Sequence, residues 1–147
     1  MTKQTLINQI NASKTYLDRS TEVLGEMDSA FAPAEGMMTV AQQIAHIALT
    51  VDWFREGAFG SGFNMDFETL DKKVDAVTSL AAAQAWCSES FTTLVKTIED
   101  CPDEDLAAAL PPGPVMGDTP RIIALGGVVE HTAHHRGALT VYSRLLN

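Results

Sequence analysis

The chain has 147 residues, of which 46% are hydrophobic, and it carries a formal net charge of −9 at pH 7. Its length and apolar content suffice for one globular domain with a buried core, which we expect to span residues 1–147. The negative charge argues against unaided binding to nucleic acid, because phosphate recognition requires clustered Lys and Arg side chains.

Targeting and membrane signals are not apparent in the sequence. The N-terminal stretch MTKQTLINQI lacks the features of a signal peptide, and no run of about 18 apolar residues occurs. We therefore expect a soluble, cytoplasmic protein with no membrane partner. The two cysteines, Cys87 and Cys101, lack the spacing of a redox or zinc pair, so we expect two buried thiols.

Helical periodicity marks two segments in the first part of the chain. The first is predicted from about Thr5 to Met27, and its apolar stripe contains Leu6, Ile10, Leu17, Leu24 and Met27. The second opens at Thr39, which forms a predicted capping box with Gln42. Its apolar row alternates steps of four and three residues through Val40, Ile44, Ile47, Val51, Phe54 and Ala58.

Two further helices are predicted in the second part. A crossover, GSGFNMDFETLDKKVDAV, has room for a short helix and leads to a third segment. That segment begins near Thr78 or Ser79 and stops at Pro102, with Leu80, Ala83, Cys87, Phe91, Leu94, Ile98 and Cys101 in its apolar row. The loop ALPPGPVMGD then precedes a fourth helix, which starts at Asp118 or Thr119 with Pro120 in its first position.

These four amphipathic helices predict an all-α fold, a four-helix bundle with long crossover loops. Strand-like alternation is missing. The fourth helix carries a predicted inward stripe of Ala124, Val128, His131, His135, Ala138, Tyr142 and Leu145. It also contains Gly126 and Gly127, which weaken a helix unless another helix or a substrate approaches closely there.

Three of the four histidines fall within EHTAHHRG, on the fourth helix. His131 and His135 are one turn apart, so both side chains can reach one point beside the helix. His134 is an alternative to His135, although its own row is less apolar. His46 flanks the apolar row of the second helix and can turn into the bundle.

Imidazoles inside a bundle need partners for their nitrogens, and a divalent metal is one such partner. Neutral imidazole suits zinc, nickel, copper or ferrous iron, and three histidines leave a position open for water or substrate. Core packing and a surface histidine patch are the alternatives that the residues leave open.

A histidine in the second helix, followed by HTAHHRG in the last, resembles the DinB/YfiT-like family, to which metal-dependent activity is ascribed. The resemblance covers nearly the whole chain and implies a four-helix bundle with His46, His131 and His135 as ligands of zinc or nickel. Family members often continue with R-G-Q, whereas Ala138 stands at that last place here. The resemblance also implies thiol-dependent chemistry and, together with the apolar helix faces, a homodimer.

Other residues are candidates for supporting roles. Asp52, Glu56 and Glu130 lie within a few helical turns of the histidines, and each is a candidate general base or a solvated carboxylate. Trp53 and Tyr142 share helical rows with His46 and His135, so they are candidates for a pocket wall or for the core. Arg136 is interpreted as structural rather than as a clamp for an anionic substrate.

Two functions are consistent with this sequence. The first is a metal-dependent enzyme, a thiol S-transferase acting on a small-molecule substrate with a low-molecular-weight thiol, with a hydrolase as the second choice. The second is a non-catalytic module that binds or senses a metal or small ligand.

Overall fold

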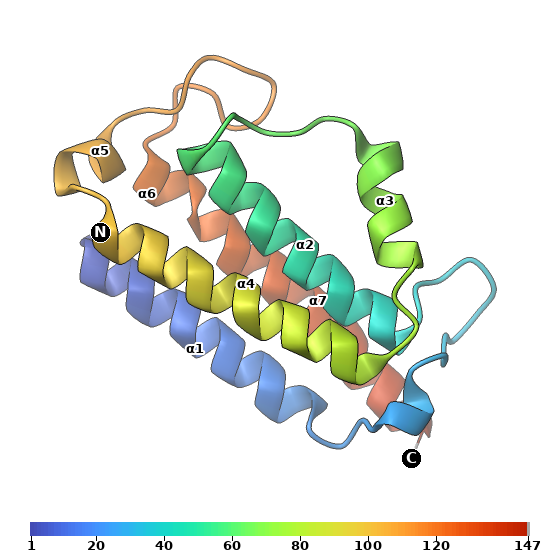
Figure 1. The fold of residues 1–147 in the computed structure, drawn as a ribbon. Helices are drawn as coiled ribbons and strands as arrows, with labels where there is room; N and C mark the ends of the chain where they lie inside the picture. Colours follow the sequence, from blue (N-terminus) through green and yellow to red (C-terminus); the bar gives the residue numbers. More distant parts are fainter. Residues whose placement is uncertain (147) are drawn as a thin grey trace.

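The computed structural model describes residues 1–146 and shows an all-α protein built on four long helices (Figure 1). These are α1 (Lys3–Thr21), α2 (Val40–Phe59), α4 (Leu80–Asp100) and α7 (Gly126–Leu146). Four short helices occupy the connections: η1 (Glu26–Asp28), α3 (Phe67–Asp75), α5 (Asp103–Ala107) and α6 (Arg121–Ala124). Within the described residues there is no strand, and the predicted four-helix bundle is confirmed.

The four long helices enclose one hydrophobic core. α2 lies between α4 and α7 and packs against both, while α1 packs against α7 and α4. None of the helices in residues 1–146 is both long and apolar enough to cross a membrane.

The second predicted helix agrees with α2. Thr39 accepts a hydrogen bond from the backbone N–H of Gln42, and the Gln42 side chain accepts one from the Thr39 N–H, which completes the predicted capping box. Its predicted row is buried throughout, from Val40 to Ala58. This row fixes which side of α2 faces the core and therefore where His46 points.

The first predicted helix is too long at its C-terminal end. α1 stops at Thr21, and Met27 is 98% exposed rather than part of the apolar stripe. Gly25 adopts an extended conformation that ends the helical path, and Asp28 accepts a hydrogen bond from the Gly25 N–H. The short helix η1 therefore points Met27 into solvent.

The fourth predicted helix is two helices. α6 ends at Ala124 and α7 begins at Gly126, and Pro120 is the N-cap of α6 instead of its first residue, because its backbone is extended. The predicted inward stripe of α7 is wrong at Leu145, which is 60% exposed, and at Ala138, which is half-buried.

The buried residues of α7 are Val128, Thr132, Leu139, Tyr142 and Ser143. His131 and His135 therefore flank the core instead of lying in its centre. Gly127 belongs to the contact with α2, because a Cβ at this position would lie 2.5 Å from Cζ of Phe54.

The third predicted helix agrees with α4, which has Ser79 as its N-cap and ends at Asp100, two residues before Pro102. η1 reinforces its start, because Glu26 accepts a hydrogen bond from the Ala81 N–H at 2.8 Å. Cys87 is a buried thiol as predicted, whereas Cys101, which follows the helix, is only half-buried.

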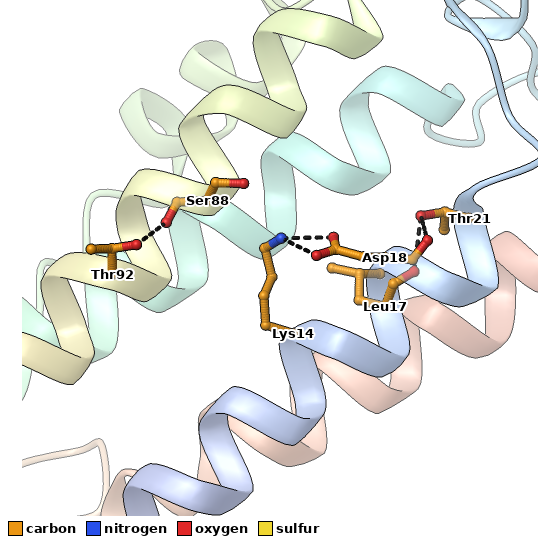
Figure 2. Close-up of polar contacts among 6 residues, drawn as sticks. All are labelled: Lys14, Leu17, Asp18, Thr21, Ser88 and Thr92. Atoms are coloured by element: carbon orange, nitrogen blue, oxygen red, sulfur yellow. Dashed lines mark hydrogen bonds and ion pairs between the residues drawn. The ribbon is translucent and has the colours of Figure 1, made fainter.

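In the middle of the side where α1 faces α4, the polar contacts drawn in Figure 2 stay within single helices. Lys14 contacts both carboxylate oxygens of Asp18, and Thr92 donates to the Ser88 carbonyl one turn earlier on α4. Residues such as Leu17, Phe91 and Leu94 supply the buried apolar surface of these two helices. Apolar packing therefore holds the middle of this side together, and Lys3 adds a polar contact at its end through the Cys101 carbonyl and Asp103.

The crossover between α2 and α4 contains the short helix that its length allowed. This helix, α3, lies beside α2 and outside the four long helices (Figure 1). It is held by Leu70 and Val74, which are 7% and 2% exposed. α3 thereby covers the part of α2 that follows His46.

Candidate metal centre

The structure brings His46 together with His131 and His135 where α2 faces α7. The Nε2 atoms of His46 and His131 are 3.1 Å apart, and the ring centroids of His131 and His135 are 4.4 Å apart. One nitrogen from each of the three rings lies within 4.8 Å of the others. Two nitrogens bound at about 2.0–2.1 Å to one tetrahedral ion are about 3.4 Å apart, so the cluster has the dimensions of a metal site.

All three rings are in an environment that favours their neutral form. Burial lowers the pKa of His131 to about 4 and that of His135 to about 3, and the neighbouring imidazoles add to both shifts. Burial also lowers the pKa of His46, although Asp71 acts in the opposite direction. Neutral imidazoles keep a lone pair available, which metal ligation requires.

The protein itself does not satisfy every nitrogen of the cluster. The buried Nδ1 atoms of His46 and His131 have no hydrogen-bond partner among the described residues. Leaving a buried polar atom unpaired costs about 1–3 kcal/mol. The Nε2 atoms of the same two rings face one another at 3.1 Å, so a cation from outside the chain could bind both Nε2 lone pairs while each Nδ1 carries the ring proton.

His135 is oriented by Gln43, which is not among the site residues predicted from the sequence. Its Nδ1 donates to Oε1 of Gln43 at 2.6 Å, which leaves Nε2 as the lone-pair nitrogen. Gln43 in turn donates to the Tyr142 hydroxyl, and that hydroxyl donates to the Met38 carbonyl at 3.0 Å. One feature of the sequence points to Gln43: it is a polar residue four positions before Ile47 and therefore lies on the apolar side of α2, where it is buried.

His134 and Arg136 lie outside the cluster. His134 is exposed, with its ring 4.9 Å from that of His135. The guanidinium of Arg136 lies over the Tyr16 ring at 5.5 Å and so connects α7 to α1. The structure therefore groups His135, and not His134, with His46 and His131.

The three carboxylates considered as general bases do not line the cavity beside the histidines. Asp52 accepts a hydrogen bond from Trp86 Nε1 on α4. Glu56 accepts hydrogen bonds from Ser61, which lower its pKa, and Glu130 is exposed. Asp71 on α3 lines that cavity instead, and the sequence does not indicate this, because the position of the short helix against α2 is not predictable from periodicity.

The two pocket candidates have different surroundings. Trp53 lines the cavity beside His46 and His131. Tyr142 is 1% exposed and belongs to the hydrogen-bonded chain behind His135 rather than to the cavity wall.

The fold and the site define a class of protein, a four-helix bundle with a histidine cluster between its second and last long helices. The sequence model of the DinB superfamily matches residues 9–139, most of the chain. The chain therefore belongs to the DinB superfamily, as its histidine motif indicated. No relative is found among curated proteins.

Proposed function

We propose that His46, His131 and His135 bind one divalent metal ion, zinc or nickel. The proposal is supported by the convergence of three neutral imidazoles within 4.8 Å. Within residues 1–146, no carboxylate, thiol or further imidazole joins these three histidines as a fourth potential ligand. Three protein ligands leave a coordination position for a small molecule, as in catalytic rather than structural sites.

The reaction that we propose is the transfer of a low-molecular-weight thiol to an electrophilic small molecule. A divalent cation held by neutral ligands lowers the pKa of a thiol or water bound to it. The thiol R–SH reacts with R′–X, so that an S–C bond forms, the C–X bond breaks, and the proton leaves with X. The product is a thioether and the acid HX.

The thiol must come from outside the chain. Burial raises the pKa of the Cys87 thiol to about 12, and burial also raises the pKa of Cys101. Neither cysteine lines the cavity beside His46 and His131. The roles of the chain are to orient His135 through Gln43 and to enclose the reactants beside the histidines.

Metal analysis of protein purified without a polyhistidine tag tests the site. We expect about one zinc or nickel ion per chain, lost on His131→Ala and retained on His134→Ala, the matched control. Binding of a small thiol to the loaded protein, followed spectroscopically after cobalt substitution, tests the reaction class. A full metal complement in His131→Ala would refute the site, and loaded protein that binds no thiol and alkylates none would refute the transferase.

Two alternatives use the same residues. A hydrolase would place water where the transferase places the thiol, and ester turnover without added thiol would support it. A non-catalytic binding or sensing module is favoured by one observation, the position of Asp52, Glu56 and Glu130 outside the histidine cavity. A bound metal that exchanges neither water nor thiol would support that module.

A further inference from the structure

A small cavity opens directly beside the histidine cluster. It has a volume of about 210 Å³, and His46, His131 and Thr50 form the part nearest the proposed metal. Cavities that hold drug-sized ligands measure roughly 300–1,000 Å³. The cavity therefore has room for one group of a substrate, adjoining the atoms that would react.

The walls of this cavity are aromatic and aliphatic. Trp53 and Phe54 from α2 and Phe67 from α3 line it, together with Leu49 and Leu70. The one polar atom of the Trp53 ring, Nε1, donates to the Asn64 carbonyl at 2.7 Å and is not available to a ligand. The wall thus presents carbon surface, which favours apolar groups by about 25 cal/mol per Å² removed from water.

The only carboxylate of the cavity is Asp71, at its exposed side. Asp71 accepts no hydrogen bond and makes no ion pair within residues 1–146, so its charge is not neutralised by a neighbour. No Lys or Arg side chain lines the cavity. An anionic group placed beside Asp71 would lose its hydration against the aromatic wall and face a like charge, with no Lys or Arg side chain in the cavity lining to offset it.

We propose that this cavity holds an uncharged aryl or compact alkyl group of the electrophile, and that Asp71 excludes electrophiles that are anionic at that end. This inference rests on the proposed function, because it assigns a substrate class to the same site. Phe67 and Asp71 both come from α3, so this short helix determines the specificity of a site whose histidines come from α2 and α7.

The two tryptophans provide a direct test by NMR. Trp53 Nε1–H reports on the cavity, and Trp86 Nε1–H, bonded to Asp52, is the internal control. Benzyl alcohol and benzoate are the probes, because they share a ring and differ in charge. In purified protein stripped of metal by a chelator, so that the benzoate carboxylate cannot coordinate an ion, we expect benzyl alcohol to shift the Trp53 signal saturably, to leave Trp86 unchanged, and to bind at least about tenfold more tightly than benzoate, a difference of about 1.4 kcal/mol.

Variants on α3 assign the effect to its residues. Asp71→Asn is expected to reduce the preference for benzyl alcohol to about threefold or less. Asp75→Asn, on the same helix but not in the cavity lining, is the matched control and should leave the preference unchanged. Phe67→Ala, a half-exposed residue, should weaken benzyl alcohol binding without unfolding the protein. Equal binding of the two probes, or a preference that survives Asp71→Asn, would overturn the proposal.

Metal uptake by the same protein separates this inference from the proposed function. A Trp53 response in protein that takes up no zinc or nickel when either is supplied supports the cavity and refutes the metal enzyme. Metal and thiol binding without any Trp53 response to benzyl alcohol would leave the enzyme intact and refute the substrate class.

Discussion

Gln43 determines which nitrogen of His135 is available to a ligand. Its carbonyl oxygen accepts the Nδ1 proton, and its amide is itself held by Tyr142. Such a partner fixes both the tautomer and the orientation of a ligating imidazole. Gln43 is therefore a positioning residue for the proposed metal, although it does not contact it.

Replacing Gln43 with methionine preserves volume and removes the acceptor. We expect Gln43→Met to lower metal affinity by about 10–100-fold, because the ring of His135 loses the hydrogen bond that orients it. A competition titration against a chromogenic chelator measures this change. Gln84→Met, at an exposed position of α4, is the control and should bind metal like the natural protein. An unchanged affinity in Gln43→Met would contradict the orienting role.

At the scale of the element, α7 begins with two glycines in different surroundings. A Cβ on Gly127 would collide with the ring of Phe54 at 2.5 Å, whereas a Cβ on Gly126 would meet nothing within 4 Å. We expect Gly127→Ala to destabilise the protein by about 1–3 kcal/mol through overpacking. Gly126→Ala should be neutral or stabilising by up to about 1 kcal/mol. Urea unfolding measures the free energy of unfolding of both variants. Equal changes in the two variants would contradict the close contact of α2 with α7.

The start of α4 carries a pH-dependent contact. Hydrogen bonding from the Ala81 N–H is the largest cause of the lowered pKa of Glu26. A carboxyl whose pKa is lowered in the fold stabilises it above its ordinary pKa, and this contribution disappears as the pH falls through the folded value. Glu26→Gln should therefore be less stable than the natural protein near neutral pH.

The stability difference between Glu26→Gln and the natural protein should shrink as the pH falls through the lowered pKa of Glu26 and be absent below it. Thermal unfolding over this pH range measures the difference. Glu35→Gln, at an exposed position of the loop before α2, is the control and should show no such trend. A difference that does not depend on pH would indicate that the Glu26 charge has no role.

Local signals in the sequence predicted the elements, but not how their ends are arranged. The capping box of Thr39 and the stop before Pro102 are encoded within a few residues, so α2 and α4 were predicted correctly. The break at Leu125 and the extended Gly25 reflect backbone conformations that periodicity does not detect. Periodicity alone therefore predicted that Met27 lies in the core, whereas the chain leaves the core before this residue.

The histidine cluster was predictable for a similar reason, because its spacing lies within α7 and its third member flanks a clear apolar row. Asp71 was not predictable, since it reaches the cavity only through the position of α3 against α2. Asp52 was proposed from its proximity in sequence, yet a helix turn directs it to Trp86 on α4. Side-chain partners across helices depend on how the helices pack, which local sequence patterns do not reveal.

At the scale of the whole molecule, the homodimer remains a prediction. Val141 and Leu145 are 53% and 60% exposed on α7, and they lie one turn apart on the same face. We expect sedimentation to give a dimer, and Leu145→Glu to shift it toward monomer. Met27→Glu, at a fully exposed position in η1, is the control and should leave the mass unchanged. A monomeric natural protein would refute the dimer.

Metal binding should also stabilise the entire bundle, because the proposed ligands join α2 to α7 across 85 residues of sequence between His46 and His131. A ligand that binds only the folded state at 100 times its dissociation constant adds about 2.7 kcal/mol. For a chain of this size each kcal/mol raises Tm by about 2–4 °C, so we expect loading to raise Tm by roughly 5–10 °C. Differential scanning calorimetry of loaded and chelated protein measures the shift. His46→Ala should have the same Tm in loaded and chelated samples, whereas the control His134→Ala should retain the shift. A shift that persists in His46→Ala would mean that the metal binds elsewhere.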